Sequence, residues 1–267
     1  MMALIPAAME ACLEHADPSW HGTLLAALAA VARADPGYFP RLLQSEYLPT
    51  ESRLLAAFAQ PLDQVRYVLV GEGPYPRAAS ATGVCFMDGT VDALWSANGL
   101  AKSVNRATSL RNFIKMLLVA EGTLRPDQTS GPPMAQIGQA ALAGGASRIQ
   151  TLPQLQQNLI DHGFLLLNAS LVFRTDTAPA KDALAWRPFF DTVVAALSAR
   201  DSPPLMILWG KIAAALGSTG PSVKLPRVVA EHPYNLSFIT NPAMQALFGP
   251  MQLLSAQACG LGAGEQR

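Results

Sequence analysis

Short apolar runs alternate with amphipathic segments along most of the chain. Four runs have the length of buried strands: RYVLV (66–70), FLLL (164–167), LMIL (205–208) and RVVA (227–230). Apolar residues at helical spacing mark the segments before and between them, at 24–31, 52–59, 109–119, 153–161, 186–198 and 211–216. Because strands that alternate with helices indicate a parallel sheet covered on both faces, we predict an α/β fold. The expected architecture is a three-layer α/β/α domain around a central four-stranded, mostly parallel sheet.

The rest of the chain sets the limits of this domain. Residues 1–60 contain helical spacing and no run of strand type, which predicts a helical N-terminal part. Residues 120–150 are rich in Gly, Pro, Ser and Ala, which predicts a surface insertion. We expect a single domain over 1–255 and a flexible tail over 256–267, where small residues dominate.

Composition excludes several classes of protein. The chain has 267 residues, of which 50% are hydrophobic, but its apolar runs are far shorter than the roughly 20 residues of a membrane span. Its three cysteines, Cys12, Cys85 and Cys259, are far apart and form no CxxC pair, which disfavours an iron–sulfur cluster or a structural zinc site. We therefore expect a cytoplasmic protein with buried thiols, no metal and no cofactor.

The balance of charge gives little support to nucleic-acid binding. The formal net charge is zero, whereas contacts to phosphate supply most of the non-specific affinity for DNA. A neutral total can still hide a basic face. The segment 101–115 holds Lys102, Arg106, Arg111 and Lys115 without an acidic residue, and it is either a basic patch or a solvated helix face.

Residues that could carry chemistry follow each predicted strand. In open α/β sheets ligands bind beyond the carboxyl ends of the strands. The loop GEGPYP (71–76) follows the first strand, Asn168 the second, Trp209 the third and His232 the fourth. Taken singly, each has a structural interpretation, such as a tight turn or a packed histidine. The glycine loop matches neither the dinucleotide nor the P-loop pattern, and no GxSxG is present, which disfavours a nucleotide-binding enzyme or an α/β hydrolase.

Taken together, these segments resemble the family-1 uracil-DNA glycosylases. That family carries a GQDPYH loop followed by GxxF, strands that end in LLN and LWG, a PPSL loop and an HPSPLS loop. The resemblance covers about residues 20–254, and its motifs occur in the family's order. The counterparts in this chain are GEGPYP (71–76), GVCF (83–86), ATSLRN (107–112), LLLN (165–168), LWG (208–210) and HPYNLS (232–237).

The resemblance implies a pocket for a uracil that is flipped out of the DNA stack. Phe86 would stack on the flipped ring, and Tyr75 would exclude the methyl group of thymine. Asn168 would donate to uracil O4 and accept from N3–H, a pattern that cytosine reverses. His232 would donate to O2, where negative charge develops as the glycosidic bond breaks. Gly71, Glu72 and Gly73 of the first loop would complete the uracil-binding set.

The resemblance also implies contacts to DNA from outside the pocket. Leu236 would be the apolar wedge that fills the vacated stack. Ser109 and Ser237 would contact backbone phosphates on either side of the lesion. Lys181, where many members have a histidine, and Arg111 would add positive charge. The expected partner is uracil-containing DNA, single- or double-stranded, and the expected state is a monomer.

One departure concerns catalysis. The family's catalytic aspartate is replaced by Gly73, and Glu72 takes the preceding glutamine position. Glu72 would supply the carboxylate in one interpretation; the iron–sulfur uracil-DNA glycosylases (family 4) have a similar Gly-Glu-Gly-Pro loop, although their cluster cysteines are missing here. In a second, the protein binds uracil or abasic DNA with weak or no hydrolysis. In a third, Asp88 or another acid reaches the site.

Overall fold

The computed structural model describes residues 5–211 and 220–256, and the chain divides into two compact units. Unit 1 comprises Met1–Thr90 and Gly163–Glu231, and unit 2 comprises Val91–His162 and His232–Arg267. Each unit therefore contains two separate stretches of the sequence. Most of the predicted helix at 211–216, Cys259 and nearly all of the predicted tail lie outside the described residues.

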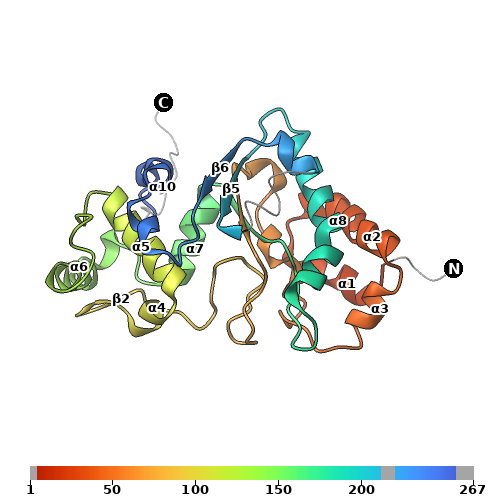
Figure 1. The fold of residues 1–267 in the computed structure, drawn as a ribbon, viewed down its shortest axis with the longest axis horizontal. Coiled ribbons are helices and arrows are strands. Elements are labelled where there is room, and N and C mark those ends of the chain that lie inside the picture. Colours follow the sequence, from red (N-terminus) through yellow and green to blue (C-terminus); the bar gives the residue numbers. More distant parts are fainter. Residues whose placement is uncertain (1–4, 212–219, 257–267) are drawn as a thin grey trace, which may run out of the picture. The chain divides into compact units, whose positions relative to one another are not determined.

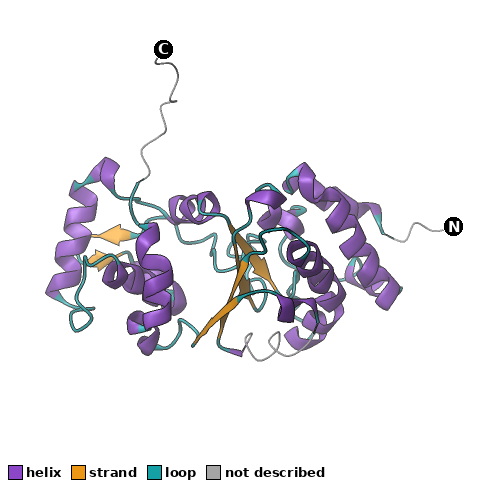
Figure 2. Cartoon of the chain, turned by 90° about the horizontal axis from the view of Figure 1, so that it is seen from above, coloured by secondary structure: helices purple, strands orange, loops and turns teal. Residues whose placement is uncertain are grey.

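Unit 1 is built on the predicted sheet. Its four strands are β1 (Tyr67–Gly71), β4 (Phe164–Asn168), β5 (Leu205–Trp209) and β6 (Arg227–Ala230). They lie side by side in the order β4-β1-β5-β6, and all three pairings are parallel (Figure 2). The strand predictions are confirmed, with ends that differ by at most one residue.

Two helices of unit 1 pack beside each other and share a core with the sheet (Figure 1). They are α2 (His21–Ala34) and α8 (Pro179–Ser198). Trp186 of α8 lies in one buried cluster with Val68 and Val70 of β1. Leu69, which points to the opposite face of the strand, is also buried. Burial on both faces explains why β1, β4 and β5 are continuous apolar runs rather than alternating ones. The strand β6 lies at the edge of the sheet, and its Val229 is exposed.

The remaining described elements of unit 1 are short. They are α1 (Ala7–Glu10), η1 (Ala11–His15), η2 (Pro18–Trp20), α3 (Tyr38–Leu42), η3 (Arg53–Phe58), η4 (Leu62–Gln64) and η6 (Pro221–Lys224). The helix expected at 52–59 is a 3₁₀ segment instead. Ser52 has a left-handed φ of 55°, and Leu55 departs from helical geometry, so the segment bends to bury Leu54 and Phe58. Apolar spacing cannot distinguish this bend from a regular helix.

Unit 2 consists mainly of helices with one short hairpin. The described elements are β2 (Trp95–Ser96), β3 (Gly99–Leu100), α4 (Lys102–Arg106), α5 (Thr108–Ala120), α6 (Pro132–Ala143), η5 (Gly145–Ser147), α7 (Leu152–Asp161), η7 (Leu236–Thr240), α10 (Pro242–Phe248) and η8 (Gly249–Met251). The stretch 120–150 contains α6, which packs on the hairpin, where Gly138 allows close approach to the backbone at Ser96. Among the described helices of the chain, none is long and apolar enough to cross a membrane.

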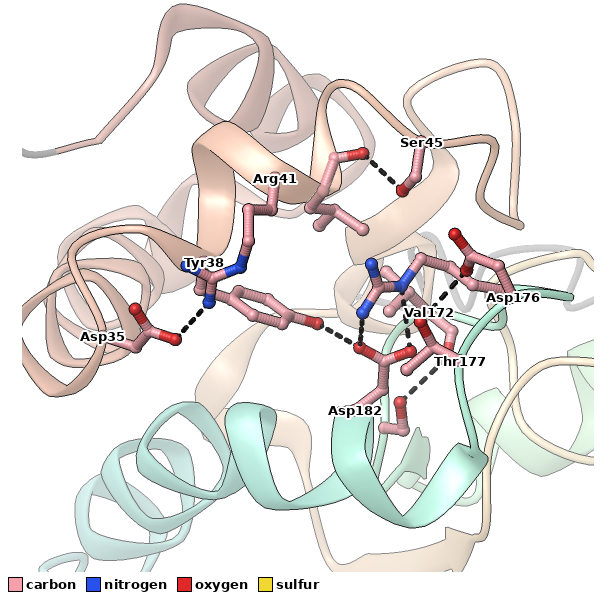
Figure 3. A network of polar contacts seen from close by, with 11 residues as sticks. Asp35, Tyr38, Arg41, Ser45, Val172, Asp176, Thr177 and Asp182 are labelled. Atoms are coloured by element: carbon pink, nitrogen blue, oxygen red, sulfur yellow. Dashed lines mark hydrogen bonds and ion pairs between the residues drawn. The ribbon is translucent and has the colours of Figure 1, made fainter.

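A buried ionic network ties the loop after β4 to the helices of unit 1 (Figure 3). Asp182, whose side chain is 1% exposed, accepts hydrogen bonds from Tyr38 Oη at 2.8 Å and from Arg174 Nη2 at 2.8 Å and Nε at 3.1 Å. Burial, followed by the hydrogen bond to Asp182, raises the pKa of Tyr38, so the phenol stays a donor. Arg174 lies in the loop that follows Asn168 at the end of β4. The network therefore supports the site described below.

We expect Asp182→Asn to lower the free energy of unfolding by roughly 1–3 kcal/mol, because it leaves the half-buried guanidinium of Arg174 without its counterion. The exposed pair of Asp35 and Arg41 is a matched control, and Asp35→Asn should change stability by less than about 0.5 kcal/mol. Urea unfolding of the two variants measures both values. Equal losses in the two variants would contradict a stabilising role for the buried network.

Candidate active site

The carboxyl ends of β1 and β4 bring two predicted site segments together. Gly71 pairs with Asn168 in the parallel register. The pairing continues beyond the strands, because Ala169 N–H donates to Gly71 O at 2.8 Å and Ser170 N–H donates to Glu72 O at 3.1 Å. β1 has β4 on one side and β5 on the other. The order of the strands in the sheet therefore changes side at β1. Ligands of open α/β folds bind at such a switch point.

Gly71 is required by close packing at this strand end. A Cβ atom there would lie 2.4 Å from Cys85 Sγ and 2.8 Å from Asn168 Oδ1. Cys85 is buried and held in place, since its N–H donates to Leu166 O at 3.0 Å. Burial raises the pKa of the Cys85 thiol to about 12. The thiol is therefore a neutral packing group behind Asn168.

Asn168 has the features of a base-reading residue. It is 5% exposed and ends the fully buried strand β4. Among the described residues, no protein group hydrogen-bonds its side-chain amide. The amide atoms are also not among the fully buried polar atoms of the described residues, so a bound molecule can reach them. Its one donor group and one acceptor oxygen are the complement of uracil O4 and N3–H.

Phe86 is held in an uncommon backbone conformation. Its φ is 69°, in the left-handed region that bulky residues rarely adopt and that surrounding structure must enforce. Its half-buried ring packs edge-to-face on Trp209, with centroids 5.6 Å apart. Trp209 ends β5, so the sheet itself supports the ring that is expected to stack on the base.

The turn before Phe86 accounts for that conformation. Thr82 Oγ1 accepts from Val84 N–H at 3.2 Å and lies 3.0 Å from Met87 O, which accepts from the hydroxyl. A Cβ on Gly83 would lie 2.0 Å from Arg53 O, and the φ of Gly83 is 83°. The turn is therefore fixed by one hydroxyl and one obligatory glycine.

The acidic residues of the first loop differ in their surroundings. Glu72 is exposed, and its carboxylate forms no ion pair with the described residues. Asp88 is buried, accepts from Thr90 N–H at 2.9 Å and Oγ1 at 2.7 Å, and lies 3.6 Å from an Arg77 nitrogen. Asp88 is therefore engaged in holding its own turn. Tyr75, between the two, is half-buried, and burial raises its pKa.

Unit 2 holds the predicted site residues of α5 and of the loop that begins at His232. His232 Nδ1 accepts from Tyr234 N–H at 3.1 Å, so a neutral ring carries its proton on Nε2 and can donate from there. Leu236 is 68% exposed at the start of η7, and Ser237 beside it is exposed too. Ser109 lies in the first turn of α5, where backbone N–H groups favour phosphate. Arg111, on the same helix, donates to Asn105 O at 3.2 Å.

Comparisons with known proteins agree with this geometry. A uracil-DNA glycosylase of Thermobifida fusca is 32% identical over 192 residues, which cover 72% of this chain and 67% of that protein. One from Tropheryma whipplei is 30% identical over 223 residues, 81% of each chain. The crystal structure of wild-type UNG from Nitratifractor salsuginis has 37% identity and a TM-score of 0.83, covering 92% of this chain and 96% of that one.

The chain belongs to the uracil-DNA glycosylase family. The predicted α/β fold is thereby confirmed, since the match to the Nitratifractor structure extends over nearly the whole chain. Membership supports the function of a DNA N-glycosylase and does not favour the alternative of an inactive uracil- or abasic-DNA-binding protein. A scan against models of protein families found no match.

Within unit 1 the structure brings together part of the predicted glycosylase pocket. Gly71 and Asn168 are in contact, and Cys85 connects them to the turn that carries Phe86. Lys181, also of unit 1, is exposed in the first turn of α8. Of the predicted residues in unit 2, His232, Leu236 and Ser237 lie on one loop, and Ser109 and Arg111 lie on α5.

Sequence reasoning missed the residues that hold the predicted site in shape. Thr82 and Cys85 support the segments of Phe86 and Asn168, and Asn112 holds the loop of His232, as described below. Their signals are weak because a threonine, a cysteine and an asparagine inside motifs look like ordinary neighbours. The one sequence signal for such packing is the glycine loop at 71–76, which predicts a tight turn.

Alanine should destabilise the protein at Gly71 and be tolerated at Gly73. Gly71→Ala places a methyl group against Cys85 and Asn168, so we expect it to lower the free energy of unfolding by roughly 1–3 kcal/mol and to slow uracil release. Gly73→Ala is the matched control, because its Cβ would lie at an ordinary 3.6 Å from Ser170. It should change stability by less than about 0.5 kcal/mol. Thermal unfolding and a uracil-release assay measure both variants, and a tolerated Gly71→Ala would contradict the packing argument.

Proposed function

We propose that this chain hydrolyses the N-glycosidic bond of uracil in DNA, with Glu72 supplying the carboxylate that the family places one residue later. The observation that carries the proposal is the pairing of Ser170 N–H with Glu72 O, which fixes the Glu72 backbone beside the strand end of Asn168. The next residue, Gly73, has no side chain to compete for the same space. Glu72 is also exposed and without an ion pair to the described residues, so its carboxylate is free to act.

Each side chain then has one task toward the flipped nucleotide. Phe86 stacks on the ring, Tyr75 opposes C5, and Asn168 pairs with O4 and N3–H. As the bond between C1′ and N1 breaks, its electron pair moves onto the uracil ring, and His232 Nε2–H donates to the negative O2. Glu72 stabilises the cationic sugar, orients the water whose oxygen bonds to C1′ and accepts the proton that this water loses. A proton then returns to the uracil anion. The products are free uracil and an abasic site.

Contacts outside the pocket would deliver the duplex. We assign Leu236 as the wedge, Ser109 and Ser237 as phosphate ligands, and Lys181 and Arg111 as sources of positive charge. These roles and that of His232 rest on the sequence motifs. Action as a cytoplasmic monomer is likewise an expectation from the sequence. The exposure of Leu236, Ser237 and Lys181 is compatible with contact to DNA.

The test is uracil release from single- and double-stranded oligonucleotides under single-turnover conditions. The matched substrates carry cytosine or thymine at the same position. We expect release of uracil and of neither cytosine nor thymine. With substrate in excess, each protein molecule should complete several turnovers. No detectable release across pH and salt, together with tight and salt-sensitive binding to uracil-containing DNA, would contradict hydrolysis and indicate a binding protein.

A further inference from the structure

A buried asparagine on α5 holds the loop that carries His232 and Leu236. The Nδ2 group of Asn112 lies 2.7 Å from Pro233 O, 3.3 Å from Tyr234 O and 3.4 Å from Asn235 O. Asn112 is fully buried, and its Oδ1 accepts from Arg111 Nε at 3.3 Å, which orients the amide with its donors toward the loop. The two N–H donors of one side chain thus serve three consecutive backbone carbonyls, with the shortest bond to Pro233 O.

The held loop is a compact turn with one functional side chain at each end. Tyr234 N–H donates to His232 Nδ1 at 3.1 Å, and Asn235 N–H donates to His232 O at 2.9 Å. Asn235 Nδ2 also donates to His232 O at 3.2 Å. Leu236 follows directly and is 68% exposed. A shift of the three carbonyls would therefore displace the apolar tip that follows the turn.

The same asparagine connects this loop to the start of α5. Asn112 lies three residues after Ser109, so the two are neighbours on one helix face. We propose that Asn112 is a positioning residue that holds the His232–Leu236 loop in register with the phosphate-binding first turn of α5. The wedge and the phosphate contact then engage one duplex at a fixed spacing. This inference rests on the roles assigned to Leu236 and Ser109 under the proposed function.

Duplex substrates should reveal this role. A wedge is needed where a base stack must be filled, and far less where the substrate is single-stranded. Loss of the buried amide should therefore slow release from duplex DNA by roughly 10–100-fold in Asn112→Ala, which corresponds to about 1.4–2.7 kcal/mol. Release from a single-stranded oligonucleotide should fall by less than about threefold. Asn112→Asp, of the same shape, should be worse on duplex because its carboxylate repels the three carbonyls.

Asn158 is a matched control in the same unit. It is also buried, and its Nδ2 donates to two backbone carbonyls, Leu253 O at 2.8 Å and Ser255 O at 2.9 Å. Asn158→Ala should cost similar thermal stability yet leave the ratio of duplex to single-strand rates unchanged. An equal change of that ratio in both variants would overturn the inference and indicate a general loss of stability.

A double-mutant cycle separates positioning from bulk effects. If Asn112 acts through the wedge, Asn112→Ala should add less than about threefold to the duplex defect of Leu236→Ala, because both remove the same step. Additive defects would overturn the proposal. Should Asn112→Ala fail to fold, Asn112→Ser retains one hydroxyl donor and serves in the same cycle. No uracil release by the wild type would contradict the proposed function. Normal release from duplex DNA by Leu236→Ala would contradict the wedge role. Each of these failures is distinguishable from a failure of the Asn112 proposal.

Discussion

Replacing Glu72 with glutamine is expected to lower the single-turnover rate of uracil release by about 10²-fold or more. The variant keeps the length of the side chain and removes its charge, so it cannot stabilise a cationic sugar or accept a proton from water. Loss of a positioned acid or base typically costs ~10²–10⁴ in rate. Because Glu72 is exposed and its backbone is fixed by Ser170, the substitution should leave thermal stability unchanged. Rapid-quench release of uracil from a duplex oligonucleotide measures the rate.

Gly73→Asp supplies the control for this experiment. A Cβ at Gly73 would lie 3.6 Å from Ser170 and meets no closer atom, and the backbone there has no left-handed φ, so an aspartate fits. We expect Gly73→Asp to restore release to Glu72→Gln, since a carboxylate then returns one residue further along. Wild-type activity in Glu72→Gln would refute the assignment. Asp88→Asn would then be the next test, although Asp88 is engaged with Thr90 and Arg77.

The fold was predictable because its strongest signal is local. The strands β1, β4 and β5 are continuous apolar runs, which strands buried on both faces require, and β6 is a short apolar run at the sheet edge. The positions of Asn168 and the glycine loop followed from the rule that ligands bind at strand ends. The pairing of Gly71 with Asn168 then confirmed that these two segments meet.

Features that depend on contacts distant in sequence were not predictable. The bend at Ser52 and Leu55 replaces a regular helix because buried neighbours select the path of the chain. The edge-to-face contact of Phe86 with Trp209 joins residues from different motifs, and the left-handed φ of Phe86 follows from a turn built by Thr82. The hydrogen bond from Asn112 Nδ2 to Pro233 O joins residues that are 121 positions apart in the sequence. Single side chains of this kind leave no periodic trace in a sequence.

Asn168→Ala should produce the second large effect, a fall of roughly 10²–10³ in the rate of uracil release. Truncation removes two hydrogen bonds to the base and leaves uracil O4 and N3–H without partners, at about 3–4 kcal/mol in total. The defect should appear in the rate at saturating DNA, because the lost contacts hold the flipped base rather than the phosphate backbone.

Two measurements separate this base contact from a structural defect. Affinity for the abasic product should stay within about threefold of wild type, since that DNA has no base for Asn168 to contact. The ratio of uracil to cytosine release should also collapse, because polar complementarity of this kind supports discrimination of about 10⁴ or more. Asn168 ends β4 beside Cys85 and Gly71, so a variant that lost product affinity and stability together would instead assign the amide a packing role. Retained release within threefold would mean that another residue reads the base.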